Sequence, residues 1–119
     1  MKKFLCFITI TLFLTSCEKW PNFLIPSSEV PRWLKERISD DEKTIKSDSL
    51  SGLRFTAWIR YEYDGDYFFE FRDPLSSSGP KVFDYDGDKT MFNHETYLNF
   101  KTERCCKQFV WKGPSYFDY

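Results

Sequence analysis

The spacing of hydrophobic residues predicts a helix near the start of the folded part of the chain. Hydrophobic side chains recur there every three or four residues, as on one face of an α-helix: Trp33, Leu34, Ile38 and Ile45. Pro31 precedes them and suits a first helical turn, where its missing N–H would have no intrahelical partner. We therefore predict an α-helix over residues 31–45.

The period changes to two in the next segment. From Leu53 to Tyr63 the odd-numbered residues are apolar or aromatic and most even-numbered ones are polar, which is typical of a half-buried strand. Asp64-Gly65 follows, and this dipeptide favours a two-residue hairpin turn because both residues tolerate positive φ. The alternation then resumes over residues 66–72. These features predict an antiparallel hairpin.

A second Asp-Gly pair predicts a second hairpin, with strands at 81–85 and 88–92. Residues 93–104 have an ambiguous pattern, whereas 108–112 is typical of a closing strand. The expected fold class is therefore α+β: one N-terminal helix packed on a four- to five-stranded antiparallel β-sheet, in a single domain over residues 31–119.

One face of this sheet is a candidate partner surface. We expect the helix to cover the odd-numbered residues of 53–71. The even-numbered face then holds Trp58 and Phe68 among charged neighbours: Arg54, Arg60, Glu62, Glu70 and Arg72. Aromatic side chains in a polar face suit recognition of a protein or a polymer. An ordinary solvated face has the same composition, so both interpretations stay open.

The N-terminal segment has the pattern of a signal peptide. Lys2 and Lys3 precede an uncharged, largely apolar run from Phe4 to Leu14. This run has the length of a signal-peptide core and is too short to span a bilayer. It ends in Leu-Thr-Ser-Cys17, which resembles the lipobox of bacterial lipoproteins. In a lipobox the cysteine receives the lipid and becomes the first residue of the mature chain.

This pattern predicts the location of the protein. Residues 1–16 are expected to be a lipoprotein signal peptide, and Cys17 the site of lipidation with palmitate-type fatty acids. Residues 17–30 contain two prolines and no period, and we expect them to be a tether. The domain would then hang from the outer membrane of a cell envelope, on its periplasmic or surface face.

Charge and composition narrow the range of partners. The chain has 17 basic and 18 acidic residues and a formal net charge of −1. It has no basic run, so we expect no nucleic-acid partner. Aromatic residues make up 20% of the chain. They fit either a dense β-rich core or an exposed face for an envelope protein or polysaccharide.

Two of the four cysteines remain for the domain once the N-terminal ones are assigned. Cys6 lies in the signal peptide and Cys17 carries the lipid, which leaves the adjacent pair Cys105-Cys106. A vicinal disulfide or two thiols is favoured over a bond to another chain. Soft metals need three or four ligands, and His94 is the only histidine in the sequence. We therefore expect no metal and no cofactor.

Catalytic signals are weak. Asp84, Asp86 and Asp88 surround a glycine as in a calcium loop, but an Asp-Gly hairpin turn explains the same residues. His94 beside Glu95 is a candidate acid–base pair, but no nucleophile motif accompanies it. We therefore expect a protein that is not an enzyme. The alternative is a small calcium-dependent or hydrolytic envelope protein that uses residues 84–88 and His94.

Three short motifs add a family resemblance over residues 31–112. They are Pro-Arg-Trp33-Leu with Ile38, Tyr-Glu-Tyr63-Asp-Gly, and Tyr85-Asp-Gly-Asp. In this order, after a lipobox cysteine, they resemble a family of small, uncharacterised lipoproteins of Bacteroidetes-type bacteria. The resemblance implies no particular activity. The expected function is a non-catalytic binding module of the cell envelope, with an inhibitor, immunity or accessory role.

Overall fold

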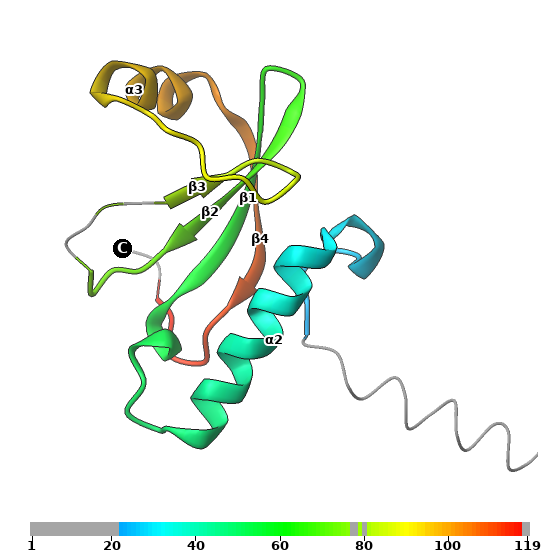
Figure 1. The fold of residues 1–119 in the computed structure, drawn as a ribbon, viewed down its shortest axis with the longest axis vertical. Coiled ribbons are helices and arrows are strands. Elements are labelled where there is room, and N and C mark those ends of the chain that lie inside the picture. Colours follow the sequence, from blue (N-terminus) through cyan, green and yellow to red (C-terminus); the bar gives the residue numbers. More distant parts are fainter. Residues whose placement is uncertain (1–21, 77–78, 80, 118–119) are drawn as a thin grey trace, which may run out of the picture.

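The fold is an antiparallel sheet with a helix on each face (Figure 1). The computed structural model describes residues 22–76, 79 and 81–117, so the expected signal peptide and Cys17 lie outside the described residues. The elements in chain order are η1 (Ser27–Glu29), α2 (Arg32–Ser47), η2 (Gly52–Phe55), β1 (Ala57–Tyr63), β2 (Asp66–Arg72), β3 (Lys81–Phe83), α3 (His94–Glu103) and β4 (Cys105–Lys112). Among the described residues, no helix combines the length and apolar composition needed to cross a bilayer.

The expected α+β class and antiparallel sheet are confirmed. The four strands lie in the order β3-β2-β1-β4, and each neighbouring pair is antiparallel. The first hairpin turns at Asp64 (φ 52°) and Gly65 (φ 82°), both in the left-handed region that the Asp-Gly pair predicts. Strands β1 and β4 therefore come from distant parts of the sequence but lie side by side.

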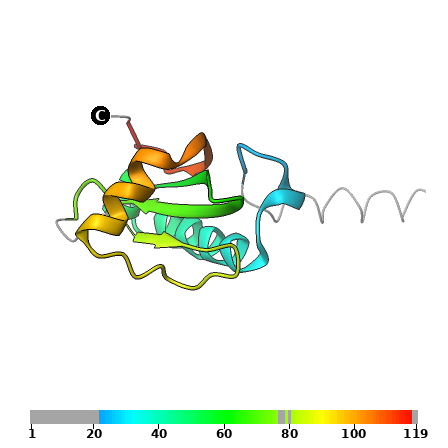
Figure 2. The ribbon, with the colours of Figure 1, turned by 90° about the horizontal axis from the view of Figure 1, so that it is seen from above.

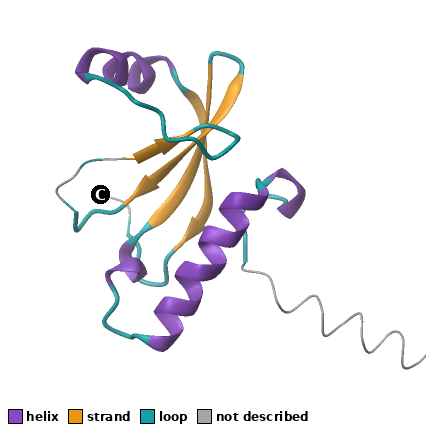
Figure 3. Ribbon diagram, in the orientation of Figure 1, coloured by secondary structure: helices purple, strands orange, loops and turns teal. Residues whose placement is uncertain are grey.

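The predicted second hairpin forms only in part: the chain reverses at residues 84–88, and the Thr90 N–H donates to the Val82 carbonyl oxygen at 2.8 Å, but no second strand extends over 88–92. Strand β3 ends at Phe83, and Lys89 makes only an isolated bridge to Phe83 where a strand was expected over 88–92. The Asp84 carboxylate accepts hydrogen bonds from two backbone N–H groups of its own loop, which curls the chain away from an extended course. The chain then runs as a long loop toward α3 (Figure 3).

The segment with an ambiguous pattern, residues 93–104, forms helix α3. Its start is specified locally, because Asn93 and Thr96 form a reciprocal capping box. The closing strand is also longer than predicted, since β4 begins at Cys105 and not at residue 108.

Helix α2 matches the predicted helix to within two residues at its end. It starts after Pro31 and buries Leu34, Ile38 and Ile45, which are the residues of the predicted stripe. Its Trp33 ring lies 5.9 Å from Trp58 (centroid to centroid) in an edge-on contact. Trp33 makes similar contacts with two rings of neighbouring strands, Phe69 and Phe83.

The prediction that α2 covers the odd-numbered residues is correct for β2, where Phe69 and Phe71 pack under the helix, but wrong for β1. The two-residue turn pairs Trp58 with Phe71 and Tyr61 with Phe68. Residues directly opposite each other share a face, so even-numbered residues of β1 lie beside odd-numbered residues of β2. Trp58 therefore faces α2 and is fully buried, with a relative exposure of 0%. Phe68 lies on the opposite face.

Helix α3 covers that opposite face (Figure 2), so the sheet lies between two helices. Phe100 is fully buried at the centre of this second cluster. Its ring lies 5.1 Å from Tyr63, 5.7 Å from Phe68 and 6.2 Å from Tyr61 (centroid to centroid). The high aromatic content thus fills two small cores, one under each helix.

The described part of the expected tether packs on the domain. Ile25 and Val30 are buried in the cluster under α2, and Phe23 packs against it. The backbone N–H of Leu24 donates to the carbonyl oxygen of Val110 on β4 at 2.9 Å. Residues 22–30 therefore belong to the folded unit.

Candidate functional site: a charged pocket between the sheet and α3

A cavity of about 380 Å³ opens beside strand β2 and helix α3. We call it the charged pocket, because five of its eight lining residues carry charge. The lining residues are Glu70, Arg72, Asp73, Ser76, Gly79, Tyr97, Lys101 and Arg104. They come from β2, the loop that follows it, α3 and the residue after α3, so the fold assembles the pocket from separate segments.

Glu70 lies at the base of this site. Its place on β2 is opposite Ile59, which puts its side chain on the face that α3 covers. The Glu70 side chain is only 2% exposed. A buried carboxylate is unfavourable unless opposite charges and hydrogen bonds compensate it. The compensation therefore has to come from neighbouring side chains.

Two arginines supply that compensation. Arg72 Nη2 lies 3.4 Å from Glu70 Oε2, and Arg104 Nη1 lies 3.3 Å from the same oxygen. The Arg72 side chain is 25% exposed and that of Arg104 is 11% exposed. Both guanidinium groups are thus held between the buried carboxylate and the pocket, in fixed positions.

Two tyrosines, Tyr61 and Tyr97, lie beside the arginines. The Arg104 guanidinium carbon lies 3.8 Å from the centroid of the Tyr61 ring, and Arg72 Nη2 donates to the Tyr61 hydroxyl at 3.4 Å. Burial, and then the Glu70 charge, raises the pKa of Tyr61 and of Tyr97 above the ordinary value of 10.0. Both phenols therefore remain neutral hydrogen-bond groups at physiological pH.

The arginine beside them stays charged. Burial by itself lowers the pKa of Arg72, but Glu70 and its tyrosine neighbours outweigh burial and raise it. The pocket lining contains one more cation than carboxylates, whereas the whole chain has a net charge of −1. Asp73, one of the two carboxylates, already accepts the backbone N–H of Leu75 at 3.1 Å. The chemistry of the pocket is therefore that of an anion receptor.

The candidate partner surface does not exist as predicted. Trp58 packs between Phe71 and Phe83, at centroid distances of 5.0 and 5.6 Å. Its buried indole N–H makes no hydrogen bond of ordinary geometry, although it lies close enough to Asp41 to lower the pKa of that carboxyl. Phe68 is half-buried under α3. Because even-numbered residues of β1 pair with odd-numbered residues of β2, Trp58 and Phe68 lie on opposite faces of the sheet.

In the loop over residues 84–88, a side chain accepts hydrogen bonds from the loop's own backbone. Asp84 Oδ1 accepts the N–H groups of Asp86 and Asp88, both at 3.0 Å. The loop also docks on α2, because the Trp33 indole N–H donates to the Tyr85 carbonyl oxygen at 2.8 Å. These bonds give the aspartates at 84–88 a structural role: they stabilise the turn and hold the loop against α2.

His94 lines a different cavity, of about 320 Å³, together with Lys89 and Thr90. Glu95 and the three aspartates, all of which are described residues, are not among the residues that line it. The cavity that His94 lines therefore does not contain the other groups of the expected alternative site.

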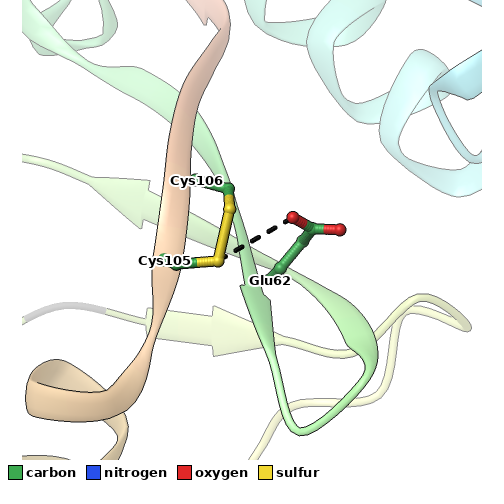
Figure 4. Close-up of side chains that lie close together, drawn as sticks. All are labelled: Glu62, Cys105 and Cys106. Carbon is green, nitrogen blue, oxygen red and sulfur yellow. Dashed lines mark hydrogen bonds between the residues drawn. A yellow bond between two sulfur atoms is a disulfide. The ribbon is translucent and has the colours of Figure 1, made fainter.

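The two adjacent cysteines are joined in a vicinal disulfide, which was one of the open alternatives (Figure 4). Cys105 Sγ lies 3.8 Å from Glu62 Oε2. Within the described residues, Glu62, Cys105 and Cys106 are the one set of three potential metal ligands whose ligand atoms lie within 4.8 Å of one another.

Sequence reasoning missed the charged pocket because its residues are distant in sequence. Glu70 and Arg104 are 34 residues apart, and Arg104 follows a helix that the pattern did not predict. The one available signal was the alternation of Glu70 and Arg72 on a strand, which we assigned to a face that is either a partner surface or an ordinary solvated surface. No family model matches the chain, and no curated protein or solved structure is significantly similar to it.

Proposed function

We propose that the chain is a lipid-anchored, non-catalytic binding protein of the cell envelope, held on the outer membrane through Cys17. We further propose that the charged pocket binds a carboxylate group of its ligand. The lipobox-like sequence supports the first part. The observation that carries the second is the pair of fixed guanidinium groups on one buried carboxylate.

The geometry of the pocket supports a carboxylate as the ligand group. A guanidinium has five N–H donors in a planar fork, which matches the two oxygens of a carboxylate. Glu70 engages Arg104 through a single contact at 3.3 Å, so the arginine retains donors for a second acceptor. Lys101 adds an exposed positive charge at the rim of the pocket.

Binding is a better proposal than catalysis for this set of groups. General acid–base catalysis needs a group whose pKa lies near the working pH. The pKa values of Tyr61, Tyr97 and Arg72 are instead raised further from neutrality. Groups that keep one protonation state are suited to holding a charged ligand.

A carboxylate has two sources in a cell envelope. An acidic segment of an envelope protein would suit an inhibitor, immunity or accessory role, and an acidic polysaccharide would suit surface attachment. Both present the same group to the pocket, so one titration series tests the shared chemistry and separates the sources.

The test is calorimetric titration of the full chain in non-ionic detergent. The probes are a short glutamate-rich peptide and an oligogalacturonate, each paired with a neutral counterpart of equal length. We expect one of the two acidic probes to bind and both neutral ones to fail. Arg104→Gln should reduce that affinity at least tenfold, because a hydrogen bond to a charged group contributes about 1.5–3 kcal/mol.

Two further variants keep the result interpretable. Lys101→Gln, at the exposed rim, should weaken binding. It avoids the loss of stability that substitution of the partly buried Arg104 could cause. Arg32→Gln removes a positive charge from the opposite helix, where the side chain is 93% exposed, and should bind as the parent does. Equal binding by all three variants, or no preference for acidic over neutral probes, would contradict the proposal.

A further inference from the structure

The disulfide between Cys105 and Cys106 lies in a bulge of the edge strand β4. Arg60 of β1 pairs with Gln108 and Glu62 pairs with Cys105, so one residue of β1 faces two residues of β4. Cys106 has a φ of 64°, in the left-handed region that residues other than glycine seldom adopt. Both cysteines are exposed.

The bulge places the two sulfur atoms on the same side of the strand. Neighbouring side chains of a regular strand point to opposite faces of the sheet. The left-handed backbone at Cys106 breaks this alternation, and Figure 4 shows both sulfurs together beside Glu62. The pairs on either side of the bulge are backbone pairs, which do not depend on the S–S bond. The strand pairing that flanks the two cysteines therefore does not require that bond.

The bond is placed where it can be reduced. The two cysteines are adjacent in sequence and both are exposed. Exposed disulfides are reduced more readily than buried structural ones. A small dithiol can reach both sulfurs.

Reduction changes what the contact with Glu62 can do. In the disulfide neither sulfur has a proton, so the 3.8 Å contact between Cys105 Sγ and Glu62 Oε2 is not a hydrogen bond. In the disulfide form the two sulfurs and the Glu62 carboxylate already lie within 4.8 Å of one another, and reduction converts them into two thiols beside a carboxylate. Two thiolates and one carboxylate oxygen occupy three positions of a tetrahedral zinc ion and leave the fourth for water.

We propose that reduction of the Cys105–Cys106 disulfide creates a binding site for Zn²⁺, with Cys105, Cys106 and Glu62 as ligands, and that oxidation removes it. A dithiol reductant supplies two electrons and two protons: the protein S–S bond breaks, two thiols form, and the reductant becomes a disulfide. Zinc binding then releases the two thiol protons to solvent. This site is separate from the charged pocket and does not depend on the proposed carboxylate ligand.

The test compares metal binding by the oxidised and the reduced full chain in detergent, under anaerobic conditions and after removal of the dithiol. Competition with a chromophoric chelator gives the zinc affinity. Co²⁺ in place of Zn²⁺ gives a thiolate-to-metal charge-transfer band that reports sulfur ligation directly. We expect one ion per reduced chain, the cobalt band, and an affinity at least 100-fold lower in the oxidised chain.

Three variants assign the ligands. The double variant Cys105→Ser/Cys106→Ser gives the background from any other thiol of the chain and should show no redox-dependent site. Glu62→Gln leaves both cysteines in place and should lower the zinc affinity of the reduced chain about tenfold while retaining the cobalt band. Glu36→Gln on α2 is the matched control and should change neither.

Some outcomes would overturn the proposal. One is equal zinc affinity in the oxidised and reduced chain, and another is equal affinity in the reduced parent and the double cysteine variant. A reduced parent without the cobalt band would also contradict it. If the serine variants do not fold, the Glu62→Gln comparison and the band of the parent still decide the question.

Discussion

At the scale of single residues, Glu70 stands out because its carboxylate is buried in a largely aromatic face of the sheet. The pairs with Arg72 and Arg104 make this burial possible, and they also fix both guanidinium groups at the wall of the charged pocket. The same contacts thus serve stability and, in our proposal, ligand binding. Replacement of one partner of such a cluster leaves the others buried without compensation.

Glu70→Gln should therefore be strongly destabilising. It keeps the shape of the side chain but leaves two arginines without their buried counter-charge, so we expect the free energy of unfolding to fall by about 3–5 kcal/mol. Urea denaturation followed by circular dichroism measures this. Glu36→Gln, on the exposed surface of α2, is the matched control and should change stability by less than about 0.5 kcal/mol. Equal stability of the two variants would contradict the role given to Glu70.

A second residue-scale prediction concerns Asp41, whose pKa is raised above 3.8 chiefly by burial, although Arg37 and Trp58 lower it. The folded state thus binds more protons than the unfolded state as pH rises through this range, so the parent loses stability there. The Asp41→Asn variant has no titrating carboxyl at this position, so it does not lose stability in this way. Its stability relative to the parent should increase between about pH 3 and pH 7, as measured by urea denaturation at several pH values. A constant difference at all pH values would contradict the burial of a charged Asp41.

At the scale of elements, the sequence pattern identified those whose hydrophobic residues repeat regularly. Helix α2 and the β1–β2 hairpin were predicted because their buried stripe and their Asp-Gly turn are local signals. Helix α3 was not, because Phe100 is its only fully buried residue and one residue gives no period. The face that α2 covers was predicted correctly for β2 but not for β1, because the two-residue turn places even-numbered residues of β1 beside odd-numbered residues of β2.

The loop after β3 also depends on a contact between elements. Gly87 has a φ of 94°, and a Cβ atom placed there would lie 3.0 Å from Cγ of Trp33 on α2. Gly65 has a similar φ of 82° but no atom within 4 Å of such a Cβ. Alanine substitution at the two glycines therefore separates the free-energy cost of the left-handed backbone, which both share, from the cost of packing, which only Gly87 has.

Gly87→Ala should thus destabilise the protein more than Gly65→Ala. Both variants incur about 1–2 kcal/mol for a left-handed backbone. Gly87→Ala adds about 1–3 kcal/mol because the Trp33 ring has to move in a packed cluster. Thermal or urea unfolding of the two variants measures the difference. Equal losses would show that the loop does not pack on Trp33 in solution.

At the scale of the whole molecule, helices cover both faces of the sheet. The two candidate sites therefore lie at the edges of the sheet and not on an open face. The charged pocket opens beside α3, and the cysteine pair lies on the edge strand β4. The pocket was not predictable from local pattern, since it depends on a strand and a helix that meet across the fold. The cysteine pair was visible in the sequence, but its contact with Glu62 was not. The location of the protein, by contrast, was predicted from residues 1–17 alone, which lie outside the described part of the chain.

We propose that this domain acts from a membrane anchor at Cys17. Two or three fatty-acid chains hold a protein on a bilayer without further contacts, because each buried CH₂ contributes about 0.8 kcal/mol. The most direct test is the intact mass of the protein isolated from the outer-membrane fraction of its cell. If the anchor is present, the isolated chain begins at Cys17 and carries fatty-acid mass on that residue. A chain that retains residues 1–16, or one that begins elsewhere and carries no lipid, would contradict this proposal.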